Sequence, residues 1–146
     1  AMIAATYYVA AVAGQPVAHV AVSTRPGMVE ARACRLVVMP EWQGAGIGLR
    51  FLQAVCERWR TGLNRHGIRV PTLFHTSHPG LCAALRRDPR WTQVSGALVG
   101  DNRTKCKESM ARAAARGRMA FTGAGYGGHF RAVQGFRYLG EGAACV

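Results

Sequence analysis

The sequence predicts an α/β fold in which helices flank a mixed, twisted sheet. Two runs of β-branched and aromatic residues, 7–12 and 17–23, surround a short turn and are typical of a β-hairpin. A glycine-rich turn at 40–48 joins an apolar run directly to a helical pattern, and another apolar run, 69–75, precedes a second helix. The resulting order is strand, strand, strand, helix, strand, helix. The length of 146 residues fits a single domain over residues 2–146.

A third strand is predicted over residues 29–39, ending at the glycine-rich turn. The helix after this turn has an apolar stripe with the i, i+3, i+4, i+7 spacing of a helix packed on a sheet. Gly62 and Gly67 mark the end of that helix, and Pro79 opens a short helix over residues 79–87. The stripe consists of Leu52, Val55, Cys56, Trp59 and Leu63.

Glycines occupy alternate positions where the third strand meets the first helix, at Gly44, Gly46 and Gly48. They leave room for a ligand at the backbone, and the following helix presents unpaired N–H groups and a positive dipole end to an anion. A P-loop would need a lysine and a hydroxyl residue next, where Leu49 and Arg50 stand. The spacing also differs from the dinucleotide-binding Gly-x-Gly-x-x-Gly. A pyrophosphate-bearing cofactor of another kind is expected, with a ligand-free turn as the alternative.

The segment from Gln43 to Gly48 resembles the acyl-CoA signature Gln/Arg-x-x-Gly-x-Gly/Ala of the GNAT acetyltransferase superfamily. Leu36, Val38 and Pro40 match the Leu-x-Val-x-Pro strand that precedes this signature in the family. The resemblance implies the GNAT fold and acetyl-CoA, or another acyl-CoA, as the donor. It also implies N–H groups at Val37 and Val38 that are free to bind the acyl oxygen. The cofactor-binding residues it implies are Leu36, Val37, Val38, Gln43, Gly44, Ala45, Gly46, Ile47 and Gly48.

The later part of the chain adds to the likeness, because residues 134–140 resemble the closing strand of the family and residues 88–91 resemble the loop after its last helix. Two features depart from the family. The N-terminal lid helices over the acceptor are shortened or absent, which predicts an open acceptor side. The helix at 79–87 lacks the tyrosine that many members use to reprotonate the CoA thiolate. Because Ala1 precedes Met2, either the native chain begins near Met2 or an upstream segment is missing.

Amine acetylation needs a base, because an alkyl amine is protonated at neutral pH. The catalytic candidates are His75 and His78, at the end of the strand beside the cofactor, and Glu30. As alternatives, Ser77 or Thr76 caps the helix with His78 filling the turn, and Glu30 is an exposed strand residue. The substrate-binding candidates are Arg35, Ser77 and Tyr126, the last within a glycine-rich loop expected to be mobile.

The five cysteines form no Cys-x-x-Cys pair and predict no metal site. Cys34, Cys56 and Cys82 fall on apolar faces and are interpreted as small core residues. The odd number of cysteines favours a reducing compartment. No secretory signal or long apolar span occurs, so a cytoplasmic protein without membrane contact is expected.

The chain carries 19 Lys+Arg against 7 Asp+Glu, a formal net charge of +12. This excess predicts an acidic partner such as nucleic acid, and Arg112 and Arg116 lie one helical turn apart, as in a phosphate-tracking face. The alternative is a solvated basic helix in an arginine-rich protein. The hairpin, the third strand and the 77–79 turn also resemble a small GNAT subgroup of phage and mobile elements, some of whose members modify nucleic acids.

The function predicted is therefore direct, ternary-complex transfer of an acyl group from CoA to a primary amine, on a modified nucleic-acid base. Two alternatives stay open. One is N-acetylation of a small amine or a protein amine, and the other is a non-catalytic module that binds CoA or nucleic acid. A homodimer could replace the absent lid.

Overall fold

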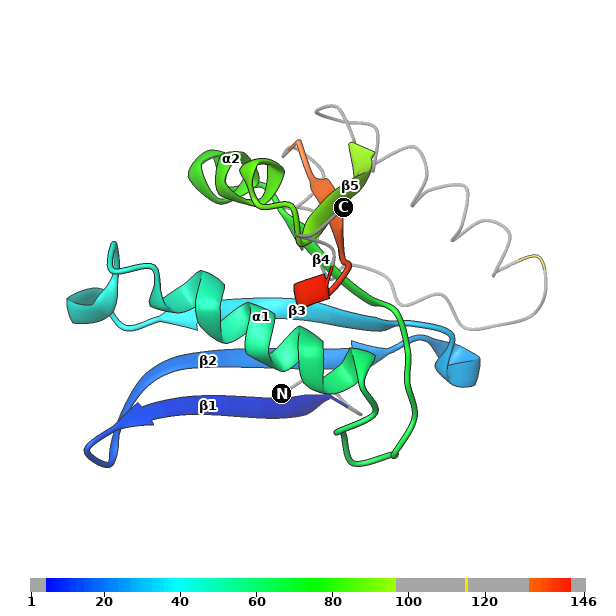
Figure 1. Ribbon diagram of the computed structural model, residues 1–146, viewed down its shortest axis with the longest axis horizontal. Helices are drawn as coiled ribbons and strands as arrows, with labels where there is room; N and C mark the ends of the chain where they lie inside the picture. Colours follow the sequence, from blue (N-terminus) through cyan, green and yellow to red (C-terminus); the bar gives the residue numbers. More distant parts are fainter. Residues whose placement is uncertain (1–4, 97–114, 116–131, 143–146) are drawn as a thin grey trace.

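The computed structural model of the protein describes residues 5–96, 115 and 132–142. A six-stranded mixed sheet with the order β1-β2-β3-β4-β6-β5 carries two helices, as the α/β prediction requires (Figure 1). The strands are β1 (Thr6–Val12), β2 (Gln15–Thr24), β3 (Ala31–Val38), β4 (Thr72–Thr76), β5 (Trp91–Gly96) and β6 (Gln134–Tyr138). The α-helices are α1 (Ile47–Arg60) and α2 (Pro79–Arg87), and the 3-10 turns are η1 (Pro26–Met28) and η2 (Pro40–Trp42).

The predicted hairpin is confirmed, with a tighter turn than expected. Ala13 and Gly14 alone form it, both with positive φ (49° and 80°), as a two-residue hairpin connection requires. Gln15 and Pro16, assigned to the turn from the sequence, already pair with β1. β3 then adds to β2 as the third antiparallel strand.

β3 and β4 are parallel neighbours over only three residue pairs, Ala31 with Thr72 to Ala33 with Phe74. Just beyond this stretch β3 contains a β-bulge. Ala21 pairs with Arg35 whereas Val22 pairs with Ala33, so Cys34 is the extra residue. The two strands therefore part at Cys34 on β3 and His75 on β4.

The bulge also shifts the alternation of side chains along β3 by one residue. Before it, the odd-numbered Ala31 and Ala33 are buried under α1, and after it the even-numbered Leu36 and Val38 face α1. Without the extra residue, strict alternation would direct Arg35 under the helix. Cys34 is thereby exposed, with its Sγ 2.9 Å from Ser23 Oγ, which corrects its interpretation as a core residue.

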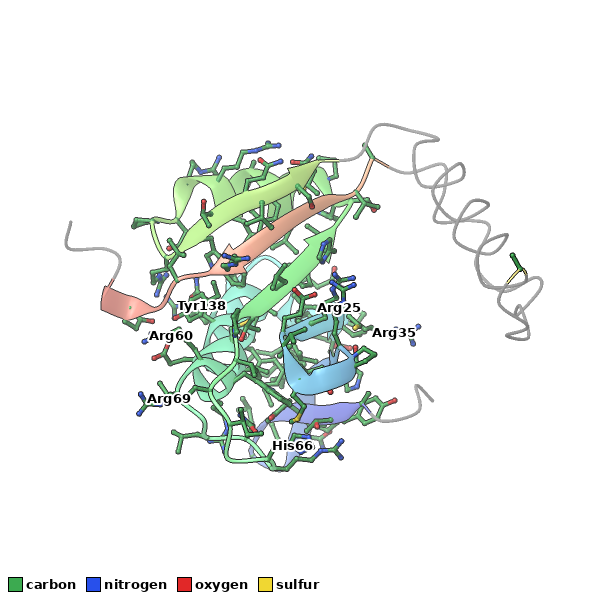
Figure 2. All side chains as sticks on the ribbon, turned by 90° about the vertical axis from the view of Figure 1, so that its right-hand side faces the viewer. Arg25, Arg35, Arg60, His66, Arg69 and Tyr138 are labelled. Atoms are coloured by element: carbon green, nitrogen blue, oxygen red, sulfur yellow. The ribbon has the colours of Figure 1, made fainter. Side chains whose placement is uncertain are left out.

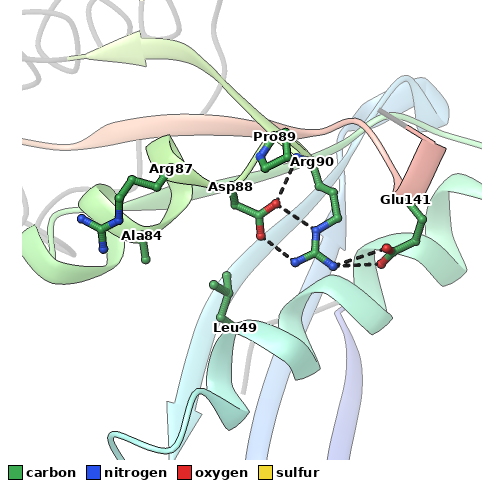
Figure 3. A pocket seen from close by; sticks show the side chains of 7 residues that line it. All are labelled: Leu49, Ala84, Arg87, Asp88, Pro89, Arg90 and Glu141. Carbon is green, nitrogen blue, oxygen red and sulfur yellow. Dashed lines mark hydrogen bonds and ion pairs between the residues drawn. The ribbon is translucent and has the colours of Figure 1, made fainter. Parts of the chain in front are cut away.

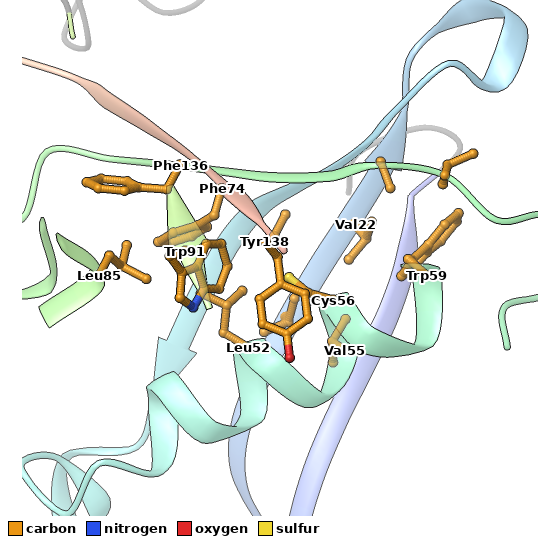
Figure 4. Packing of buried hydrophobic residues seen from close by; sticks show 14 of the residues in the cluster. Val22, Leu52, Val55, Cys56, Trp59, Phe74, Leu85, Trp91, Phe136 and Tyr138 are labelled. Atoms are coloured by element: carbon orange, nitrogen blue, oxygen red, sulfur yellow. The ribbon is translucent and has the colours of Figure 1, made fainter. Parts of the chain in front are cut away.

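The hydrophobic core lies between the sheet and the two helices, which both contribute buried residues to one cluster and therefore cover the same face. Figure 4 shows side chains of this cluster. Most of the predicted stripe of α1 is buried, but Leu63 is 62% exposed because the helix ends at Arg60 and Gly62 turns the chain with a positive φ. Cys56 and Cys82 are buried, as predicted. The stripe residues at the core are Leu52, Val55, Cys56 and Trp59.

The sequence did not predict a strand at the end of segment 88–91, which was expected to be a loop. Trp91 instead begins β5, the edge strand next to β6. Trp91 is 5% exposed, and its ring centroid lies 5.1 Å from that of Tyr138 on β6. This contact anchors the edge strand to the core. The closing strand expected at 134–140 is present as β6.

A carboxylate links the two helices to β5. Asp88, directly after α2, accepts a hydrogen bond from Gln53 Nε2 of α1 at 2.6 Å. It also accepts one from Arg90 Nη2 at 2.8 Å (Figure 3). Arg90 also pairs with Glu141 at 3.1 Å. Because Gln53 is only 5% exposed, its amide depends on Asp88 for a partner. Among the described residues, no helix is long and apolar enough to cross a membrane.

We expect Asp88→Ala to lower the free energy of unfolding by about 1–3 kcal/mol, because it leaves the buried amide of Gln53 unpaired. Hydrogen bonds from Arg90 lower the pKa of Asp88 below 3.8, so its stabilising effect is present above that pH and is lost as the pH falls through the lowered pKa. Urea unfolding of wild type and variant at a series of pH values measures both effects. Arg87→Ala is the matched control, because Arg87 is exposed and lies beside Asp88 on the same pocket. An equal loss in both variants would contradict this role of Asp88.

Candidate functional site

A cavity of about 610 Å³ lies between the start of α1, the end of β3 and α2. It brings together the residues predicted to bind a cofactor, except Val37 and Ala45, which do not line it. α2 contributes the opposite wall. The lining residues are Leu36, Val38, Trp42, Gln43, Gly44, Gly46, Ile47, Gly48, Leu49, His78, Gly80, Leu81 and Ala84.

The three glycines of this cavity serve two different purposes. Gly44 and Gly46 have positive φ values of 84° and 73°, and a Cβ at either position would face open space. Gly48 lies inside α1, where a Cβ would stand 2.8 Å from Cγ2 of Val38. The first two therefore shape the turn and leave its surface open, and the third lets α1 approach β3 closely.

The start of α1 suits an anion. Its N-cap residue is Gly46, and no side chain caps the helix. The first helical residues, Ile47, Gly48 and Leu49, line the cavity, so uncapped N–H groups and the positive end of the helix dipole lie at its wall. A pyrophosphate group fits this donor set.

The end of β3 presents backbone groups to the gap beside β4. The N–H of Met39 donates to the carbonyl of Val17 on β2 at 2.9 Å, so by alternation the amide of Val37 also faces β2. The amides of Leu36 and Val38 then point away from β2. Of the two N–H groups expected to be free, only that of Val38 faces the gap. Gln43 Nε2 donates to the carbonyl of Val38 at 3.0 Å and ties the glycine turn to the strand.

His75 lies on the face of the sheet opposite the helices, which we call the outer face. It is the first residue of β4 beyond the pairing with β3, and its ring covers Gly135, where a Cβ would stand 2.8 Å from Nε2. The imidazole is half-buried, and its Nδ1 has no hydrogen-bond partner within the described residues. Burial, and then the positive charge of Arg32, lower the pKa of His75, which Glu30 partly opposes.

Glu30 is occupied as a counter-ion. Its Oε1 lies 2.9 Å from Nη2 of Arg32 and 3.5 Å from Nη1 of Arg25. Its side chain is 16% exposed, so it is neither a free base nor the exposed strand residue of the alternative interpretation. Arg35 is exposed on the outer face, whereas Tyr126 lies outside the described residues.

His78 is the N-cap of α2. Its Nδ1 accepts the N–H of Leu81 at 3.2 Å, and its own N–H donates to Oγ1 of Thr76 at 3.1 Å. The alternative left open by the sequence, a cap by Ser77 or Thr76 with His78 filling the turn, therefore names the wrong capping residue, and histidine is not among the preferred N-cap residues. His78 lines the cavity at the start of α1 and also a second pocket of about 500 Å³ with Ser77, and thus stands between the two.

The arrangement separates two chemical environments. The helix side of the sheet offers a cavity suited to a phosphorylated ligand, and the outer face offers a half-buried imidazole. The pairing of β3 with β4 ends at Ala33 and Phe74, so the two strands part close to both environments.

Known proteins share the fold of this chain. A family model described as an acetyltransferase (GNAT) domain matches residues 4–85, more than half of the chain. No curated protein sequence matches the chain.

Solved structures give the same result at the level of fold. A Bacillus subtilis acetyltransferase in complex with CoA aligns over 92% of this chain and 76% of its own, with a TM-score of 0.60 and 9% identity. A Vibrio cholerae spermidine N-acetyltransferase aligns over 94% and 66%, with a TM-score of 0.60 and 16% identity. A GNAT family acetyltransferase from Elizabethkingia anophelis with acetyl-CoA bound aligns over 92% and 74%, with a TM-score of 0.57 and 10% identity.

We expect Gly48→Ala to weaken CoA binding, because the added methyl pushes α1 away from Val38 and widens the cavity. Overpacking of this kind costs about 1–3 kcal/mol, against about 1 kcal/mol gained in helix propensity. Titration calorimetry with CoA and urea unfolding measure the two effects. The double variant Gly48→Ala with Val38→Ala removes the clash and should recover affinity. Wild-type affinity in the single variant would contradict the close contact.

Proposed function

The chain belongs to the GNAT acetyltransferase family, and on this premise we propose that it transfers an acetyl group from acetyl-CoA to a primary amine on an acidic acceptor, a nucleic acid. The observation that carries the proposal is the cavity at the start of α1, which lies at the end of β3, where this strand parts from β4, the strand of His75. A cytoplasmic location is part of the same proposal.

Acetyl-CoA supplies an acyl carbon that is already activated as a thioester. The uncapped N–H groups at the start of α1 bind the pyrophosphate, and the glycine turn lets it approach the backbone. The amides of Leu36 and Val38, which point into the gap, bind the acyl oxygen and the pantetheine arm. Because these donors are fixed in a strand, they need no rearrangement as charge develops on that oxygen.

His75 acts as the base in this proposal. Its lowered pKa keeps the imidazole neutral at pH 7 and so able to accept a proton from the attacking amine. Arg32 contributes to this effect, and the ion pair with Glu30 holds Arg32 in place. The Cδ2–Nε2 edge of the ring faces Gly135, so Nδ1, which has no partner among the described residues, is the nitrogen that accepts the proton in this proposal.

The charge of the chain supports an acidic acceptor. The net charge is +12, and Arg35 and Arg137 lie exposed on the outer face without an ion pair among the described residues. Figure 2 shows Arg25 and Arg35 on one side of the molecule and Arg60 and Arg69 on the other, so positive charge is present on both. Phosphates suit such a surface, and a polyanion gains more from it than a small amine does.

We expect His75→Gln to lower kcat/KM by about 100-fold to 10,000-fold, as for loss of a general base. In wild type, kcat/KM rises with pH through a midpoint below 6.5, because the unprotonated imidazole is the active form. The variant should lose this midpoint. Thiol release at saturating acetyl-CoA over a range of pH tests both points. His66→Gln, an exposed histidine after α1, is the control, and an unchanged profile in His75→Gln would contradict the assignment.

We expect turnover on amine-bearing duplex DNA or RNA to exceed turnover on polyamines and basic peptides, and to fall steeply with salt. The measurement is thiol release across this acceptor panel, with the acetylated product identified by mass. Arg35→Glu should lower the nucleic-acid rate more than the rate on a small amine. Turnover restricted to small amines would refute the acidic acceptor, and CoA binding without any turnover would favour a non-catalytic module.

A further inference from the structure

His78 stands where the cofactor cavity meets the second pocket. Only three side chains with polar hydrogens line the cofactor cavity, those of Trp42, Gln43 and His78, as far as the described residues go. Gln43 uses its amide on the carbonyl of Val38, and Trp42 belongs to η2, at the entrance to the glycine turn. His78 is therefore the polar side chain that the α2 wall contributes.

The hydrogen bond to α2 fixes the tautomer of His78. Its Nδ1 accepts the N–H of Leu81, so Nδ1 carries no proton. A neutral imidazole has one N–H, which must then lie on Nε2. The cap therefore presents a hydrogen-bond donor, not an acceptor, on the free edge of the ring.

The ring is also held in place by its neighbour. A Cβ at Gly80 would stand 3.2 Å from Cε1 and 3.5 Å from Nδ1 of His78, so the absence of a side chain there leaves space for the imidazole. The hydrogen bond from Leu81 fixes the Nδ1 edge of the ring, and Gly80 lies close to the same edge. A donor held in this way loses little freedom when it binds.

We propose that Nε2–H of His78 donates a hydrogen bond to the sulfur of CoA as the thioester breaks, an inference that rests on the proposed acetyl transfer. In this step the amine nitrogen forms a bond to the acyl carbon, the carbon–sulfur bond breaks, and its electron pair stays on sulfur. The amine proton goes to His75, and the thiolate later takes a proton from water. His78 thus stabilises the leaving group without changing its own protonation state.

Two substitutions separate this role from helix capping. His78→Asn retains an oxygen that can cap α2, because asparagine is a preferred N-cap residue, but it has no donor at the position of Nε2. His78→Gln places an amide N–H near that position but caps poorly. The melting temperature of His78→Asn should therefore exceed that of His78→Gln. The hydrogen bond to sulfur should instead be stronger in His78→Gln than in His78→Asn.

The decisive measurement compares the affinities of CoA and desulfo-CoA, which lacks the sulfur, as the pH rises and the thiol ionises. In wild type the preference for CoA should grow by about 10-fold to 100-fold, the usual effect of a hydrogen bond to a charged group. His78→Asn should abolish this growth, and His78→Gln should keep part of it. His66→Gln should match wild type.

The same preference in His78→Asn as in wild type would overturn the proposal and leave His78 as a cap alone. A ¹⁵N spectrum showing the proton of His78 on Nδ1 would overturn it as well. Acetyl transfer by wild type would still support the proposed function in either case, whereas a wild type that binds no CoA would overturn both.

Discussion

The short parallel contact between β3 and β4 is the constraint on which the rest of the structure depends. Three residue pairs join the strands, and the bulge at Cys34 ends the pairing by bending β3 away. The same bulge turns Leu36 and Val38 toward α1 and leaves Arg35 on the outer face. One extra residue therefore separates β3 from β4, places apolar side chains along the cavity at the start of α1 and directs a positive charge to the opposite side.

The cavity keeps its shape because its walls are tied to one another at separate points. Gly48 allows α1 to lie against Val38, and Gln43 bonds the glycine turn to the same residue. At the other side, Gln53 and Asp88 link α1 to the end of α2. These contacts join elements that are distant in sequence, and they act together with the core at Leu52 and Trp59 to fix the distance between the two helices.

The sequence was sufficient for the hairpin, both helices, most of the buried stripe of α1 and the glycine-rich turn, because each has a local signal: alternation, helical spacing or the position of glycines. It was not sufficient for the bulge, because an extra residue leaves no mark in a run such as 31–38, and Cys34 was therefore placed in the core. β5 was missed because its pairing partner, β6, lies about forty residues further along the chain. The roles of Glu30 and His78 depend on contacts with Arg32 and Leu81, which no pattern of residue types reveals.

The two faces of the sheet also differ in how well they tolerate substitutions. Tyr7, Val9 and Val37 are 47%, 60% and 41% exposed on the outer face, whereas Leu36 and Val38, their neighbours in β3, pack under α1. Substitutions at these exposed positions leave the packing under α1 intact. The chemistry of the outer face, and with it the kind of molecule that this face suits, can therefore change without disturbing the cavity on the helix side.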